Sequence, residues 1–180
     1  MPIATSYLTA ARAEFTHNRS VIRNILETLP EADLHDNRGA SNSIAILVQH
    51  LYRAQVRRWT DILGSRSGSE VPPQIADFQK DWKEDQALDR AELLSLSDAG
   101  WDLVLGALDG LSDADLDRPV PLRGSEVPLL QAIINHWAHY SYHVGQLVLL
   151  AKIATRGKWT VAAAKEKVKP EPAKTVAVPA

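Results

Sequence analysis

Residues 134–146 read INHWAHYSYHVGQ, and this stretch carries the pattern that decides the fold. His136, His139 and His143 occur in it at steps of three and four residues. On a helix, with about 100° per residue, His136 lies about 60° and His143 about 40° around the axis from His139. The three side chains therefore share one arc. We expect the helix to begin near Pro128, where proline costs no hydrogen bond, and to run past Lys152.

Three other stretches repeat apolar residues at the spacing of an amphipathic helix. We expect these helices over about residues 3–29, 44–64 and 91–108, with capping side-chain oxygens at residues 41–43 before the second. No stretch shows a convincing strand alternation. The pattern therefore predicts an all-α fold, a four-helix bundle.

Two polar connections separate these helices. Residues 64–90 are rich in Gly, Ser, Pro and charged residues, with room for a helical turn. This connection is long enough to cross the bundle, so the second and third helices can run parallel. An up-down-down-up order is therefore open beside the simple up-down order. The other connection, before the fourth helix, contains Asp113, Asp115, Asp117, Pro119 and Pro121.

The composition is that of a globular protein, with 180 residues, 45% of them apolar and 23% charged. The chain has no cysteine, which excludes a disulfide framework, a thiolate zinc site, an iron–sulfur cluster and a cysteine nucleophile. We expect one domain over residues 1–159. Residues 160–180 are rich in Ala, Lys and Pro and are predicted to form a mobile tail.

The charge is distributed unevenly. Residues 1–155 carry 14 basic and 20 acidic side chains, whereas residues 156–180 carry 6 basic and 2 acidic ones. An acidic body speaks against nucleic acid as a partner. Neither a signal peptide nor a membrane-spanning apolar run is evident, so we expect no membrane association and a cytoplasmic location.

The histidine spacing suits a metal site. His139 and His143 are about 6 Å apart along a helix axis and can reach one ion, although spacing alone leaves the pair His136/His139 open. His50, on the second helix, is the obvious third donor. Three imidazoles suit a divalent ion such as zinc or nickel. The plainer alternative is a set of polar groups at a bundle edge, as we expect for the solvated His17 and His35.

Five motifs, in the same order over about residues 5–155, resemble the DinB/YfiT-like superfamily, and within it a bacterial branch of unknown function. They are Asn42-Ser43-Ile44-Ala45, Gln49-His50-Leu51, Arg58-Trp59-Thr60-Asp61, Leu122-Arg123-Gly124-Ser125-Glu126 and the segment His139-Tyr140-Ser141-Tyr142-His143-Val144-Gly145-Gln146. The resemblance implies an up-down-down-up four-helix bundle that forms a homodimer. It also implies one divalent metal ion held by His50, His139 and His143.

Other residues are candidates for roles beside the metal ion. His136 has no counterpart among the family's ligands and is a candidate for a pocket residue. Gln146 can orient a ligand through its amide or satisfy a backbone group. Arg57 and Arg58, two turns after His50, can face an anionic substrate or pair with an acid. Tyr140 and Tyr142 can donate protons, but packing is the simpler role for them, as it is for Trp59, Trp101 and Trp137.

Characterised relatives in the superfamily include thiol-dependent isomerases and transferases. The resemblance therefore implies a metal-dependent transferase or hydrolase acting on a small molecule, with a low-molecular-weight thiol as one candidate cosubstrate. Because the chain has no cysteine, such a thiol has to arrive with the cosubstrate. The alternatives are a non-catalytic, stress-related metal-binding dimer and a purely structural bundle.

Overall fold

The computed structural model describes residues 3–39, 42–64 and 85–160, with the side chains of residues 61, 63 and 64 left out. Within these ranges the chain forms four long helices, which are α1 (Ile3–Thr28), α3 (Ile44–Gly64), α5 (Arg90–Asp109) and α6 (Leu129–Ala154). A short helix α2 (Glu31–His35), a 3₁₀ turn η1 (Asp113–Asp115) and two strands, β1 (Pro119–Leu122) and β2 (Ser125–Pro128), complete the described elements. The helix ends agree with the sequence prediction to within two residues.

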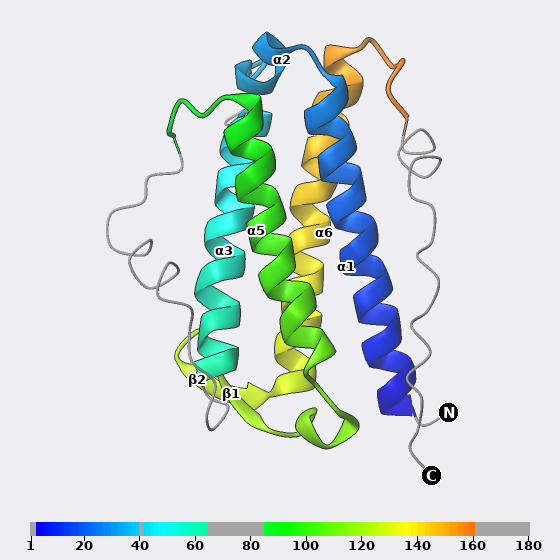
Figure 1. Cartoon of the computed structure of the whole chain (residues 1–180), viewed down its shortest axis with the longest axis vertical. Helices are drawn as coiled ribbons and strands as arrows, with labels where there is room; N and C mark the ends of the chain where they lie inside the picture. The colour runs from blue at the N-terminus through cyan, green and yellow to red at the C-terminus, as the bar shows by residue number, and fades with distance from the viewer. Residues whose placement is uncertain (1–2, 40–41, 65–84, 161–180) are drawn as a thin grey trace.

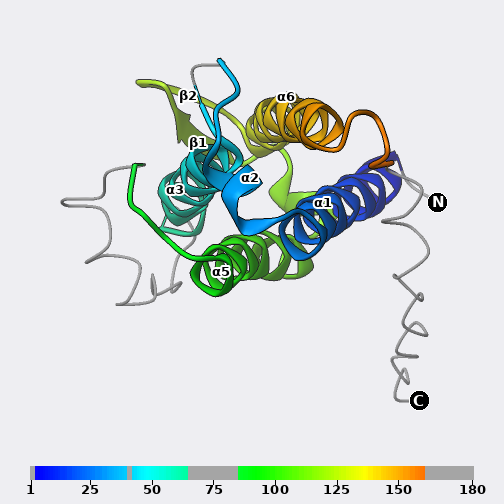
Figure 2. The same ribbon diagram turned by 90° about the horizontal axis from the view of Figure 1, so that it is seen from above.

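The four long helices run up, down, down and up (Figure 1). Seen from above, α5 lies between α1 and α3, and α6 closes the ring against the same two helices (Figure 2). Helices α3 and α5 are therefore parallel neighbours. This confirms the four-helix bundle and decides between the two helix orders that the sequence left open. The predicted helical turn in the connection and the predicted mobile tail fall on residues 65–84 and 161–180, outside the described ranges.

Local sequence explains several of the helix ends. Asp89 and Glu92 form a reciprocal capping box at the start of α5, with Asp89 accepting from the Glu92 amide at 2.9 Å. The Ser43 hydroxyl accepts from the amide of Ile46 at 3.3 Å, as expected for a cap of α3. Arg90 donates to the carbonyl oxygens of Leu26 and Leu29, which satisfies backbone acceptors at the end of α1.

The core centres on one aromatic side chain from each long helix. The ring centroid of Phe15 lies 6.3 Å from Trp59, 6.1 Å from Trp101 and 5.7 Å from Tyr140. All four side chains are buried, and the Trp59 indole donates to the Tyr140 hydroxyl at 3.1 Å. Neighbouring helix residues lie about 100° apart, so burial of Trp59 and Tyr140 places Arg58 and His139 at the edge of the core.

The hairpin of β1 and β2 is a finding that the sequence pattern did not predict. Val120 pairs with Val127, and Arg123 and Gly124 form the turn with φ values of 52° and 83°. Two positive φ angles are typical of the tight type I′ turn of a two-residue hairpin. The hairpin lies at the lower end of the bundle (Figure 1), in contact with α3 and α6. It therefore forms a wall beside the face that carries the histidines.

The C-terminal part of the described chain is attached to α1. Trp159 is buried, and its indole donates to the Asn24 side chain at 3.1 Å. The predicted domain limit at residue 159 stays a prediction. Among the described helices, none has both the length and the apolar character that crossing a membrane requires.

Candidate metal centre

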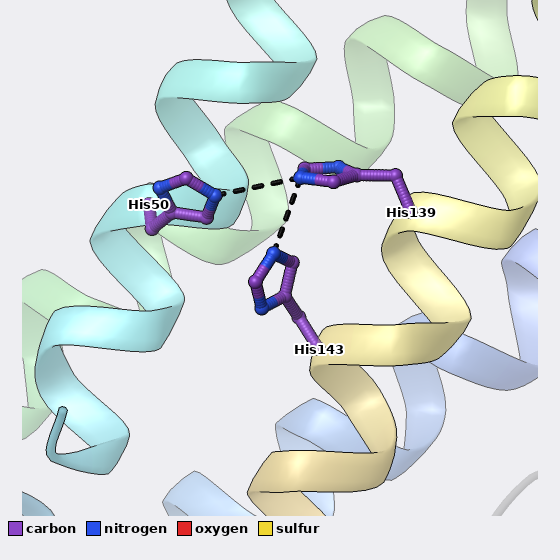
Figure 3. A group of neighbouring side chains, drawn as sticks. All are labelled: His50, His139 and His143. Atoms are coloured by element: carbon purple, nitrogen blue, oxygen red, sulfur yellow. Dashed lines mark hydrogen bonds between the residues drawn. The ribbon is translucent and has the colours of Figure 1, made fainter. Parts of the chain in front are cut away.

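Three histidines from two helices converge on one point. His50 comes from α3, and His139 and His143 come from successive turns of α6 (Figure 3). The Nε2 atom of His139 lies 3.4 Å from Nε2 of His50 and 3.1 Å from Nε2 of His143. One ligand nitrogen from each of the three side chains lies within 4.8 Å of the others. The structure thus brings together the three residues that the resemblance selected, and it favours the pair His139/His143 over His136/His139.

These distances fit a shared metal ion. Zinc–imidazole bonds are about 2.0–2.1 Å long, so two nitrogens on one tetrahedral ion lie about 3.3–3.4 Å apart. The donor set consists of three half-buried imidazoles. Among the described residues, no acidic side chain belongs to this group. Such a set suits a borderline divalent ion.

Gln146 fixes the chemical form of one ligand. The Nδ1 atom of His143 donates to the Oε1 atom of Gln146 at 2.8 Å, because a carbonyl oxygen can only accept. In a neutral imidazole the other nitrogen, Nε2, then carries the lone pair, and this atom faces His139. Of the two roles left open for Gln146, this hydrogen bond fits the orienting one, since metal-binding histidines commonly donate their second ring N–H to an oxygen acceptor.

Burial also keeps His139 in the form that binds metal. Loss of hydration, followed by the charge of Arg58 and the neighbouring histidines, lowers the pKa of His139 from 6.5 to about 3. The imidazole is therefore neutral at physiological pH, with a lone pair available for a ligand bond. Its Nδ1 atom is buried and has no hydrogen-bond partner among the described residues.

His136 lies one turn away from His139, inside the core and apart from the three converging histidines. It is 1% exposed and packs against Trp59, at a ring-centroid distance of 5.6 Å, and against Tyr140. Loss of hydration, with the charge of Arg58 next in importance, lowers the pKa of His136 to about 3. This histidine is therefore a neutral buried group, separate from the converging three.

The other candidate residues divide between core and site. Trp59, Trp101 and Tyr140 are buried, as packing predicts, and burial raises the pKa of Tyr140, which keeps its hydroxyl neutral. Tyr142 is 66% exposed, with its ring centroid 5.2 Å from that of His143. The predicted exposure of His35 is confirmed, whereas His17 is half-buried.

A pocket opens beside His50 and His139, two of the three converging histidines. It has a volume of about 170 Å³, and its lining residues are His50, Arg53, Ala54, Arg57, Arg58 and His139. Arg57 and Arg58 were predicted as possible substrate contacts, but Arg53 was missed. The signal for Arg53 was present, because residues three and seven positions after His50 lie on its helix face.

Comparison with known proteins agrees with this fold. A family model described as "Protein of unknown function (DUF1572)" matches residues 2–167. No curated protein matches the chain. Among solved structures, a DinB-like protein (YjoA) from Bacillus subtilis superposes with a TM-score of 0.61 at 17% identity, covering 81% of this chain and 92% of its own. A DinB-like protein from Bacillus cereus gives a TM-score of 0.57 at 15% identity, with coverages of 83% and 91%.

At these identities the solved structures establish a shared fold, that of DinB-like proteins, and nothing about activity. The family model spans most of the sequence, including all three converging histidines and the hairpin. The chain therefore belongs to the family of proteins of unknown function called DUF1572.

Proposed function

We propose that the protein binds one divalent metal ion through His50, His139 and His143 and acts as a metal-dependent transferase or hydrolase on a small molecule. The observation that carries the proposal is the convergence of three Nε2 atoms, one of them held as a lone-pair donor by Gln146. Zinc and nickel are the proposed ions, because imidazole ligands suit both.

The accessible pocket supports an active rather than a purely structural site. It reaches His50 and His139, so a small molecule can approach the proposed ion from the side of Arg57 and Arg58. A divalent ion in such a site lowers the pKa of a bound water or thiol and so supplies a nucleophile at neutral pH. Since the chain has no cysteine, a thiol version of the reaction needs a low-molecular-weight thiol as cosubstrate.

The decisive experiment is metal analysis by mass spectrometry on the full, tag-free chain. We expect close to one equivalent of zinc, nickel or a similar ion in the wild type. The variants His50→Ala, His139→Ala and His143→Ala should each retain less than a tenth of it. His35→Ala is the matched control, since this histidine is exposed on α2 and should leave the metal content unchanged.

Absence of metal from the wild type, even after incubation with zinc and nickel salts, would refute the proposal. Equal metal content in the wild type and the three variants would refute the ligand assignment. If metal binds as expected, the next step is to add low-molecular-weight thiols to the nickel- or cobalt-loaded protein. A change in the visible absorption spectrum would support a thiol cosubstrate at the same site.

We also propose that the protein is cytoplasmic and that it forms a homodimer, of which the resemblance implies only the dimer. Support for an interface comes from α6, where large apolar side chains remain exposed on one side of the helix, namely Ile134, Tyr142, Leu149 and Ile153. Light scattering after size-exclusion chromatography should give about twice the chain mass for the wild type, and the chain mass for Leu149→Glu. A wild-type monomer at micromolar concentration would contradict the dimer.

A further inference from the structure

A second pocket shares two lining residues with the first and is not lined by any of the three converging histidines. Its volume is about 180 Å³, and its lining residues are Arg57, Arg58, Pro121, Leu122, Arg123 and His136. The two pockets share Arg57 and Arg58. Both pockets therefore reach the same two arginines, the first from the side of His50 and His139 and the second from the side of the hairpin and His136.

The three arginines that line the second pocket, Arg57, Arg58 and Arg123, have no acidic partner among the described side chains. No hydrogen bond or ion pair connects Arg57, Arg58 or Arg123 to an acidic group in the described ranges. Arg58 is half-buried, and loss of hydration lowers its pKa, as do the charges of Arg123 and Arg57. Arg57 and Arg123 are exposed, so the partly desolvated charge is that of Arg58, and like charges beside it are unfavourable unless an anion compensates them.

His136 supplies an independent observation in the same pocket. The side chain is 1% exposed, and neither ring nitrogen has a hydrogen-bond partner among the described residues. A buried polar group without a partner costs about 1–3 kcal/mol, so such groups are rare outside binding sites. Because the neutral imidazole has one N–H group, it can donate one hydrogen bond to a ligand atom in the second pocket.

The hairpin turn places the third arginine at the pocket. Arg123 has a φ of 52°, in the left-handed region that side chains other than Gly, Asn and Asp seldom occupy. The type I′ turn of the hairpin imposes this conformation on its first central residue. The hairpin thus brings a guanidinium next to Arg57 and Arg58, which lie on α3.

We propose that the second pocket binds the doubly charged oxyanion group of a small-molecule substrate, such as a phosphate monoester. Arg57, Arg58 and Arg123 compensate its charge, and His136 donates a hydrogen bond to it. The rest of the molecule extends past Arg57 and Arg58 toward His50 and His139. That the substrate reacts at the end near His50 and His139 rests on the proposed metal function. The anion subsite itself does not need a metal ion.

The test is calorimetric titration of the full chain with inorganic phosphate at constant ionic strength, with metal content measured on the same samples. We expect Arg58→Gln and Arg123→Gln each to weaken phosphate binding at least tenfold, and His136→Phe at least threefold. Lys152→Gln removes one positive charge from the exposed end of α6 and should change affinity less than twofold. Acetate, with a single charge, should bind at least tenfold more weakly than phosphate.

His139→Ala separates this proposal from the metal site. Phosphate affinity that persists in His139→Ala and falls in Arg123→Gln, with metal retained in the latter, supports the anion subsite. Loss of phosphate binding in His139→Ala with no loss in either arginine variant would place phosphate on the metal ion and overturn the proposal. Equal affinities in the arginine variants and Lys152→Gln would also overturn it. A metal-free wild type that binds phosphate through Arg123 would refute only the proposed metal function.

Thermal unfolding of each variant checks its folding. Arg123 is exposed at the hairpin tip, so Arg123→Gln should unfold at the wild-type temperature, and it gives a clear answer even if Arg58→Gln is perturbed.

Discussion

Arginines on two faces of the bundle differ in whether they have acidic partners. Between α1 and α5, each arginine has an acidic partner: Arg12 lies 2.6 Å from Asp109, Arg19 contacts Asp98 and Asp102, and Arg23 also contacts Asp98. On the other face, between α3 and the hairpin, Arg57, Arg58 and Arg123 have no acidic partner among the described residues. Paired arginines complete their interactions within the fold. The unpaired arginines leave positive charge that an anionic ligand can compensate, and the three converging histidines beside them offer nitrogen lone pairs.

The largest expected difference between the two faces is their response to chelator. A ligand that binds only the folded state at a free concentration about 1,000 times its Kd stabilises that state by about 4 kcal/mol. Metal removal should therefore lower the unfolding temperature of the wild type by several degrees in calorimetry. His139→Ala should show no such shift. A wild-type melting curve that is identical with and without chelator would mean that no ion contributes to stability.

A smaller effect is expected from the pH dependence of His136. Its pKa is about 3 in the folded state and about 6.5 in the unfolded chain, so between these values only the unfolded chain takes up the proton. The contribution of His136 to the free energy of unfolding is therefore fully present above about pH 6.5 and is lost as the pH decreases toward 3. Between pH 7 and pH 5 the free energy of unfolding should fall by about 2 kcal/mol for this reason. Urea unfolding at both pH values, with chelator present throughout, should show this loss in the wild type.

His136→Phe is the matched variant for the pH measurement, because it removes the titrating group and keeps a ring of similar size. The variant should lose about 2 kcal/mol less than the wild type between pH 7 and pH 5. The same loss in both proteins would show that His136 does not remain neutral in the fold.

The smallest expected effect is the difference in the free energy of unfolding between two arginine variants, one from each face. Arg19→Gln removes contacts with Asp98 and Asp102 and should lower the free energy of unfolding by about 0.5–1 kcal/mol, less in 1 M salt. Arg58→Gln should leave this free energy unchanged or raise it, because its charge is partly desolvated and lies near other arginines. Urea titrations measure both variants. An equal loss in the two would remove the distinction between the faces.

Much of the fold follows from the spacing of residues along the chain. Apolar side chains at steps of three and four predict the four long helices, and the same spacing brings His139 and His143 together. The helix order, and the choice between His136 and His143 as the partner of His139, need tertiary information. His136 lies in the core, packed against Trp59 and Tyr140, and the local sequence does not show which part of the shared arc faces the core and which faces α3.

The hairpin shows where sequence patterns are too weak. Pro119 and Pro121 interrupt the ladder of β1, and each strand is only four residues long, so the alternation barely rises above chance. What stabilises the hairpin is its contact with α3 and α6, which local sequence does not encode. The role proposed for Arg123 depends on this placement. In the sequence, its membership of the motif at residues 122–126 gives no sign of that role.

The attachment of Trp159 to Asn24 has a consequence for how the protein forms. These residues are 135 positions apart in the chain, and His50 and His139 are 89 apart. Contacts of such long range form late, because a large loop must close before they contribute. During synthesis, α1, α3 and α5 leave the ribosome with an open side, and only α6 closes it. The same docking event therefore completes the core and assembles the three histidines, so a chain released before α6 is finished has neither.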